Sequence, residues 1–220
     1  MNESSVATEQ FLSGAERLVM QLLALPGQSG QEGRVMEFIT RRLRQAGVPQ
    51  QAVRFDSAHR RSPHGGETGN LIVRLPGTIA GPRRLLIAHV DTVPLCQGAK
   101  PVRRGRWIVP AEAHTALGAD DRAGAAALLI TALEIINRRL PHPPLVFLWT
   151  VQEEVGLYGA RNVALGSLGR PRLAFNFDGS SPEKVTIGAT GGYRMDITIR
   201  GKASHAGNGP KAGVSGIVIA

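Results

Sequence analysis

Three uninterrupted apolar runs constrain the fold of this chain most, because each one ends in a histidine or an acidic residue. The runs are 85–88, 145–151 and 173–177, and the ionisable residues that follow them are His89 and Asp91, Glu153 and Glu154, and Asp178. Such runs are typical of strands buried on both faces, in a sheet covered by helices. In open α/β sheets, ligands gather at the carboxyl ends of the strands. We therefore expect these side chains to meet at one edge of one sheet.

An adjacent pair of carboxylates, Asp120 and Asp121, stands directly before a long apolar helix. Apolar residues from Ala125 to Ile136 recur at helical spacing, and Pro141 ends the pattern. An aspartate in this position is most often only a helix N-cap. A cap needs one acidic residue, however, and here there are two. We interpret Asp120 as a carboxylate that bridges two metal ions.

The rest of the pattern predicts an α/β fold with a change of character near residue 190. Amphipathic helices are expected at about 9–25 and 31–45, and short strands at 52–55, 70–75 and 184–188. Strict alternation from Tyr193 to Arg200 predicts a half-exposed strand that opens a second domain. The final apolar run, 214–220, has no polar end. We therefore expect the sequence to be the front part of a longer chain.

Composition argues against several classes of protein. The formal net charge is +9, but the arginines are scattered in pairs with few aromatic residues between them, so we expect no nucleic-acid partner. No run is long and apolar enough to cross a bilayer, and the polar first ten residues do not form a secretory signal. Cys96 is the only cysteine, which rules out an internal disulfide and favours a reducing cytoplasm.

The ionisable residues are of the types that bind divalent metals. Histidine with aspartate and glutamate, without clustered cysteine, is a ligand set for zinc, with cobalt or manganese as alternatives. One bridging carboxylate would hold two ions about 3.5–4 Å apart, with an activated water between them. A further carboxylate must stay off the metals to move a proton. Glu153 and Glu154 suit these two tasks, one as a ligand and its neighbour as the base.

Together these motifs resemble the dinuclear zinc peptidases, a family that includes peptidase T, carboxypeptidase G and the acylamino-acid deacylases. The matching elements, in the expected order, are His89 with Asp91, residues 118–124, Glu153 with Glu154, Asp178 with Gly179, and residues 204–207. The 118–124 element looks most like the peptidase T branch. The resemblance implies a three-layer α/β/α catalytic domain with a mostly parallel or mixed sheet in residues 1–189. Residues 190–220 would begin an inserted α+β lid or dimerisation domain.

The resemblance also implies a metal-binding role for four residues. Asp120 would bridge both ions. In the family, the peptide bond that follows this aspartate is cis. His89 and Asp178 would complete one site, and Glu154 would serve the other. The family takes a further histidine for this second site from a later part of the chain, and no histidine follows His205 here. His114 is the alternative within this sequence, and we do not favour it.

Three residues would assist the reaction without binding metal. Glu153 would be the general base, and Asp91 would accept a hydrogen bond from the other ring nitrogen of His89. His205, in the lid, would help stabilise the oxyanion, often reaching across from a partner subunit of a homodimer.

The expected function is hydrolysis of amide bonds in short peptides, as by a tripeptide aminopeptidase with two zinc ions. A carboxypeptidase or an N-acyl-amino-acid deacylase on the same scaffold is the alternative within hydrolases, with a peptide or an acylated amino acid as substrate. The alternative of another class is a catalytically inert metal-binding fragment.

Overall fold

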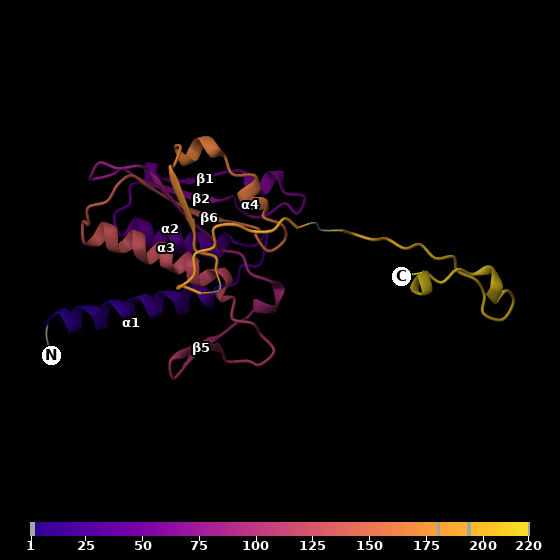
Figure 1. Cartoon of the computed structure of the whole chain (residues 1–220). Coiled ribbons are helices and arrows are strands. Elements are labelled where there is room, and N and C mark those ends of the chain that lie inside the picture. The colour runs from indigo at the N-terminus through magenta and orange to yellow at the C-terminus, as the bar shows by residue number, and fades with distance from the viewer. Residues whose placement is uncertain (1–2, 180, 193–194, 220) are drawn as a thin grey trace. The chain divides into compact units, whose positions relative to one another are not determined.

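The computed structural model describes residues 3–179, 181–192 and 195–219 (Figure 1). The chain divides into two compact units, Met1–Ser181 and Pro182–Ala220. The domain boundary expected near residue 190 falls inside the second unit. Among the described residues, no helix combines the length and the apolar character needed to cross a membrane.

A five-stranded mixed sheet forms the centre of the first unit. Its strands, in spatial order, are β1 (Val53–Phe55), β2 (Leu71–Leu75), β6 (Leu145–Thr150), β3 (Arg84–His89) and β7 (Leu173–Asn176). Strands β6, β3 and β7 are parallel to one another, whereas β1 and β2 are antiparallel additions at one edge. The carboxyl ends of three parallel strands therefore lie at one edge of the sheet, as the apolar runs predict.

Helices cover one face of this sheet and a short irregular segment covers the other, which gives three layers. The first layer consists of α1 (Glu3–Leu23), α2 (Gly33–Gln45) and α3 (Ala119–Asn137) (Figure 1). These helices pack on alternate strand residues such as Val73 and Phe147. The intervening residues, such as Ile72 and Leu148, pack on the opposite face with Leu168. That face is covered by residues around α4 (Tyr158–Arg161) and a 3-10 turn, Leu165–Leu168. The predicted α/β class is confirmed.

Burial differs among the three parallel strands. All six residues of β6 are buried, as expected for a central strand. All four residues of β7 are exposed, and Leu173 and Phe175 are 49% and 46% exposed. The prediction that this third run is buried on both faces is therefore wrong. Among the described residues, β7 is the last strand in the order and pairs with β3 alone, and neither hydrophobic core cluster contains one of its residues.

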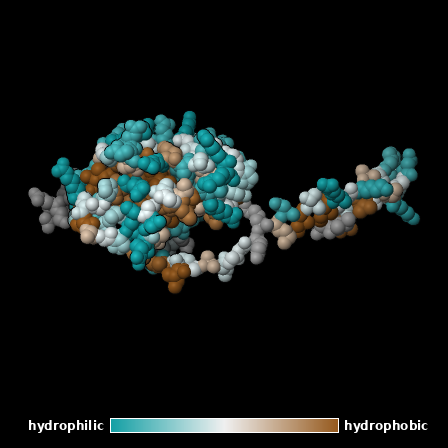
Figure 2. All heavy atoms as spheres, turned by 90° about the horizontal axis from the view of Figure 1, so that it is seen from above, coloured by the Kyte–Doolittle hydropathy of each residue, from teal (hydrophilic) through white to brown (hydrophobic). Residues whose placement is uncertain are grey.

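The second unit differs from expectation more strongly. Residues 184–188 and 195–200 form no strand, so both strand predictions are wrong there, while Tyr193 and Arg194 lie outside the described residues. A strand needs a hydrogen-bonded partner, and the described part of this unit has a single bridge, between Lys202 and Val214. Its helical segments are a 3-10 turn, Pro210–Ala212, and α5 (Gly216–Ile219). Hydrophobic side chains lie at its surface (Figure 2).

A hairpin in the first unit was not expected from the sequence. It consists of β4 (Pro101–Arg104) and β5 (Trp107–Pro110), paired antiparallel. Gly105, with φ of 62°, occupies the turn between them, in a left-handed conformation that glycine adopts without strain.

Candidate metal centre

The three parallel strands and the start of α3 bring six of the seven predicted site residues to one place. His89 is the last residue of β3, and Asp91 follows two positions later. The loop after β6 carries Glu153 and Glu154. Asp178 comes two residues after the end of β7, and Asp120 lies in the first turn of α3.

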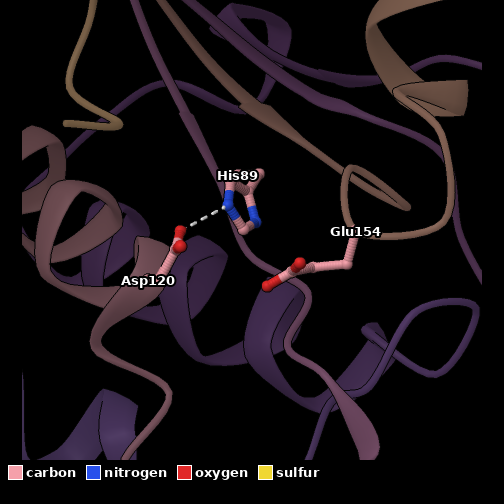
Figure 3. Close-up of side chains that lie close together, drawn as sticks. All are labelled: His89, Asp120 and Glu154. Atoms are coloured by element: carbon pink, nitrogen blue, oxygen red, sulfur yellow. Dashed lines mark hydrogen bonds and ion pairs between the residues drawn. The ribbon is translucent and has the colours of Figure 1, made fainter. Parts of the chain in front are cut away.

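His89 lies at the centre of this group and is almost completely buried. Its Nε2 atom is 3.1 Å from Oδ1 of Asp120. The same nitrogen is 3.9 Å from a carboxylate oxygen of Glu153 and 3.9 Å from one of Asp178. Ligand atoms of His89, Asp120 and Glu154 lie within 4.8 Å of one another, and all three side chains face a common space (Figure 3).

The donor set fits a divalent metal ion. Burial raises the pKa of Glu153, Glu154 and Asp178, and the charges of neighbouring carboxylates raise it further against the opposing effect of His89. Carboxylates that crowd together in this way repel one another unless protons or cations neutralise them. One imidazole nitrogen with several carboxylate oxygens is a ligand set that zinc accepts.

The grouping of possible ligands differs in detail from the predicted one. His89, Asp120 and Glu154 form one group, and His89, Asp121 and Asp178 form the other. His89 is the only histidine in these groups of described residues. His114 is exposed and belongs to neither group. The prediction paired Asp120, rather than Asp121, with Asp178.

Asp91 is a buried acceptor for several donors. Its Oδ1 atom is 3.4 Å from Nδ1 of His89, the pair of groups that the resemblance implies, and its backbone carbonyl oxygen accepts from the same nitrogen (3.1 Å). Its two oxygens also accept the N–H groups of Glu153 and Glu154 (2.9 and 3.2 Å) and the hydroxyl of Ser29 (2.6 Å). Burial raises the pKa of Asp91, but the hydrogen bonds from His89, Ser29 and Glu153 outweigh it and the net shift is downward. Sequence reasoning missed the bonds to Ser29 and to the loop after β6.

The contact with Asp91 also shifts the pKa of His89, in the upward direction. Burial lowers the pKa of His89, but the hydrogen bond and charge of Asp91, with the charges of Asp121 and Glu153, raise it to about 9. Histidine binds a metal ion as the neutral imidazole, so an ion at Nε2 would have to displace the proton that this nitrogen carries below the pKa.

The two aspartates at the start of α3 have different environments. The peptide bond between Asp120 and Asp121 is cis, as the resemblance implies. Asp121 is buried, and its carboxylate accepts the N–H of Gly124 (3.1 Å) and the N–H of His89 (3.1 Å). Asp121 thus caps the regular part of the helix. The simple N-cap interpretation holds for Asp121, whereas the side chain of Asp120 is directed at His89.

Arg122, the next residue, is fully buried and binds backbone carbonyls. Its guanidinium donates to the carbonyl oxygen of Val90, which lies between His89 and Asp91. It also donates to three carbonyls at and after the end of α1, those of Leu22 (2.6 Å), Leu25 (3.2 Å) and Gly27 (3.2 Å). Burial lowers the pKa of Arg122 to about 10, so the side chain stays charged at neutral pH. Spacing in the sequence carries no signal for this role.

The seventh predicted residue, His205, lies in the second unit. It is exposed, and its Nδ1 atom accepts the N–H groups of Gly207 and Asn208 (both 3.1 Å). Its assignment as an oxyanion ligand stays a prediction.

Comparison with known proteins places this geometry in a family. The sequence model of "Peptidase family M28" matches residues 70–208. Carboxypeptidase G2 of a Pseudomonas species is 31% identical over 160 residues, covering 69% of this chain and 36% of that protein. A tripeptidase from Staphylococcus aureus superimposes with a TM-score of 0.71 and 27% identity, covering 93% of this chain and 53% of that one. The aminopeptidase PepT from Bacillus cereus superimposes with a TM-score of 0.66 and 28% identity, covering 93% and 54%.

The chain spans about half the length of the curated relatives it matches, or less. The resemblance to peptidase T and carboxypeptidase G is confirmed. The family model matches more than half of the chain, and it covers every strand end that carries a predicted metal ligand. The chain therefore belongs to peptidase family M28.

Proposed function

We propose that this chain carries the metal-binding and catalytic residues of a hydrolase that cleaves amide bonds in short peptides, as a tripeptide aminopeptidase with two zinc ions. The observation that carries the proposal is that carboxylate oxygens of Asp120, Glu153 and Asp178 all lie within 4 Å of Nε2 of His89. The family and the similarity to a tripeptidase and an aminopeptidase support it. A cytoplasmic location and a homodimer formed through the second domain belong to the same proposal.

Four side chains would hold the ions. Asp120 would bridge them, His89 and Asp178 would complete one site, and Glu154 would serve the other. When bound, the ions would polarise the scissile carbonyl and lower the pKa of water. Asp91 would keep His89 in the tautomer that leaves Nε2 free for metal, because the Nδ1 atom faces Asp91.

Glu153 would carry the proton through the reaction. Its side chain is partly exposed at the site, and burial raises its pKa, which favours proton exchange nearer to neutral pH. Glu153 would take a proton from water as the water oxygen bonds to the carbonyl carbon. It would then return this proton to the amide nitrogen as the carbon–nitrogen bond breaks. His205 would stabilise the oxyanion that forms in between.

The similarity to carboxypeptidase G2 favours a second candidate, a carboxypeptidase or N-acyl-amino-acid deacylase. The ligands and the base would be the same, and only the side of the amide bond that is recognised would differ. A panel of tripeptides, peptides ending in glutamate and acylated amino acids separates these activities.

The test combines metal content with turnover. We expect elemental analysis after dialysis to find zinc, and the panel to show cleavage of tripeptides from the amino end. Replacing Glu153 with Ala should lower turnover by at least about 10²-fold and leave the metal content nearly unchanged. Loss of metal and turnover together would contradict the assignment of Glu153 as base. Bound zinc with no hydrolysis of any substrate would favour the inert metal-binding fragment.

A further inference from the structure

The loop after β6 directs three consecutive backbone N–H groups at two buried carboxylates. The N–H of Gln152 donates to Oε1 of Glu32 (3.1 Å). The N–H groups of Glu153 and Glu154 donate to the two oxygens of Asp91 (2.9 and 3.2 Å). Successive N–H groups that converge in this way form an anion-binding arrangement. The backbone beside the proposed base and ligand is therefore held by acids from two other parts of the chain.

Gln152 is the residue at which this loop turns. Its φ angle is 53°, in the left-handed region that residues other than glycine seldom adopt. Such a conformation persists where the surroundings determine it strongly. The side chain is fully buried, its Nε2 donates to the carbonyl of Gly65 (2.6 Å), and its Oε1 accepts the hydroxyl of Ser62. A Cβ atom at Gly66 would lie 2.6 Å from this Nε2, so the glycine leaves room for the contact.

Glu32 connects the loop after β6 to the loop before α2. Its side chain is fully buried, and Oε1 also accepts the N–H of Gly30 (2.8 Å). It directly precedes α2, yet its carboxyl does not cap that helix. One buried carboxyl oxygen thus ties together two segments that lie 120 residues apart.

We infer that Glu32, Ser62 and Gly65 form a clamp on Gln152, and that this Gln152 clamp positions Glu153 and Glu154. The inference rests on the proposed function, in which these two residues are base and ligand. Glu32 and Gln152 are positioning residues, since they hold the backbone next to the acting side chains. A misplacement of about 1 Å at a catalytic group can cost about 10²-fold in rate. The expected consequence of loosening the clamp is a lower kcat, with KM little changed.

Three variants separate the hydrogen bond from the space that the side chain fills. Glu32→Met keeps the length of the side chain and removes the acceptor. Glu32→Gln keeps an acceptor oxygen, so its amide exchange at residues 152–154 should resemble that of the wild type. Glu37→Gln makes the same chemical change as Glu32→Gln, but at an exposed position of α2, and is the matched control.

Hydrogen–deuterium exchange of the metal-free full chain provides a readout that requires no turnover. In Glu32→Met, the amides of residues 152–154 should exchange at least about tenfold faster while the central strands keep their protection. Glu32→Gln and Glu37→Gln should stay within about twofold of the wild type. In zinc-loaded protein, kcat for a tripeptide should fall at least about tenfold in Glu32→Met, with KM within about twofold.

Two results would overturn the inference: unchanged exchange at residues 152–154 in Glu32→Met, or equal acceleration throughout the sheet. If Glu32→Met does not fold, Ser62→Ala is measured instead. This variant removes the hydroxyl that donates to Gln152 and accepts the N–H of His64 (3.2 Å), and it leaves Glu32 in place. Faster exchange at 152–154 in Ser62→Ala supports the clamp, and unchanged exchange overturns it. Failure of the proposed function is recognised separately, as a wild-type protein that exchanges as expected but neither binds zinc nor cleaves peptides.

Discussion

Strands β6 and β7 both lead to carboxylates of the proposed metal centre, and yet they are supported in different ways. Strand β6 is buried along its whole length, between neighbours on both sides. Strand β7 is exposed along its whole length and, within the described part of the chain, pairs only with β3. The loop after β6 is held by Glu32 and Asp91. Asp178, after β7, lies 3.9 Å from His89.

The comparison shows that the site is assembled from one firmly packed element and one edge element. The acids after β6 are placed by packing and hydrogen bonds that need no metal. The acid after β7 lies at the exposed margin of the sheet, where local opening is easiest. The position of Asp178 should therefore depend more on a bound ion than the positions of Glu153 and Glu154.

The largest expected effect compares two phenylalanines that flank the same residue. Phe147 of β6 and Phe175 of β7 are both register partners of Leu86. Phe147 is fully buried, so Phe147→Ala should lower the free energy of unfolding by about 3–5 kcal/mol. Phe175 is 46% exposed, and Phe175→Ala should cost less than about 2 kcal/mol. Urea unfolding measures both, and equal losses would show that β7 is as well supported as β6.

The next effect is a pH dependence of the free energy of unfolding that arises from Glu32, a member of the Gln152 clamp. Burial raises the pKa of Glu32 from its ordinary 4.5 to about 7. The carboxyl group of Glu32 therefore holds its proton more tightly in the folded protein than in the unfolded chain. The resulting stabilisation is complete below about pH 4.5 and is lost as the pH rises through about 7, by at most about 3 kcal/mol.

The measurement is the free energy of unfolding of metal-free wild type minus that of Glu32→Gln, which cannot ionise. This difference should fall between about pH 4.5 and pH 7.5. Burial also raises the pKa of Asp121 to about 7, but both proteins share Asp121, so its effect cancels. The matched control is again Glu37→Gln. A difference that rises with pH would contradict the assignment of a proton to buried Glu32.

The smallest expected effect concerns a single tie to Asp91. Ser29→Ala removes the hydroxyl that donates to Asp91, while the N–H groups of Glu153 and Glu154 still donate to it. We expect a loss of about 1–2 kcal/mol in the free energy of unfolding at pH 7. Ser167→Ala, at an exposed hydroxyl that bonds locally to Ala164, should cost less than about 0.5 kcal/mol. A loss well above 3 kcal/mol for Ser29→Ala would show that Asp91 depends on this one donor.

The sequence predicts those parts of the fold and site that follow from periodicity and from strand ends. Continuous apolar runs identify β3, β6 and β7, and the rule for carboxyl ends of parallel strands places His89 near Glu153 and Asp178. Periodicity does not give the order of strands in the sheet. It therefore could not reveal that β7 is an edge strand, and the prediction of its burial was wrong for that reason.

Other features depend on contacts between distant segments. Residues 195–200 alternate like a strand but pair with no strand among the described residues, so the pattern misleads there. The β4–β5 hairpin carries a local signal, Gly105 between Val102 and Ile108, that could have been recognised. The left-handed turn at Gln152 carries none, because its cause is contact with Glu32 and Ser62.

The guanidinium of Arg122 has a consequence for how the N-terminal helix and the metal centre depend on each other. Its donors reach carbonyls at the end of α1, in the following turn at Gly27, and at Val90 beside His89. A Cβ atom at Gly27 would lie 2.7 Å from this guanidinium and 2.8 Å from Cγ2 of Val35, so the glycine leaves the space that both side chains occupy. A buried cation whose acceptors are missing is strongly unfavourable. Displacement of α1 would therefore remove acceptors that hold Arg122 in place beside the carbonyl of Val90, so undocking of the helix would also loosen the backbone next to His89.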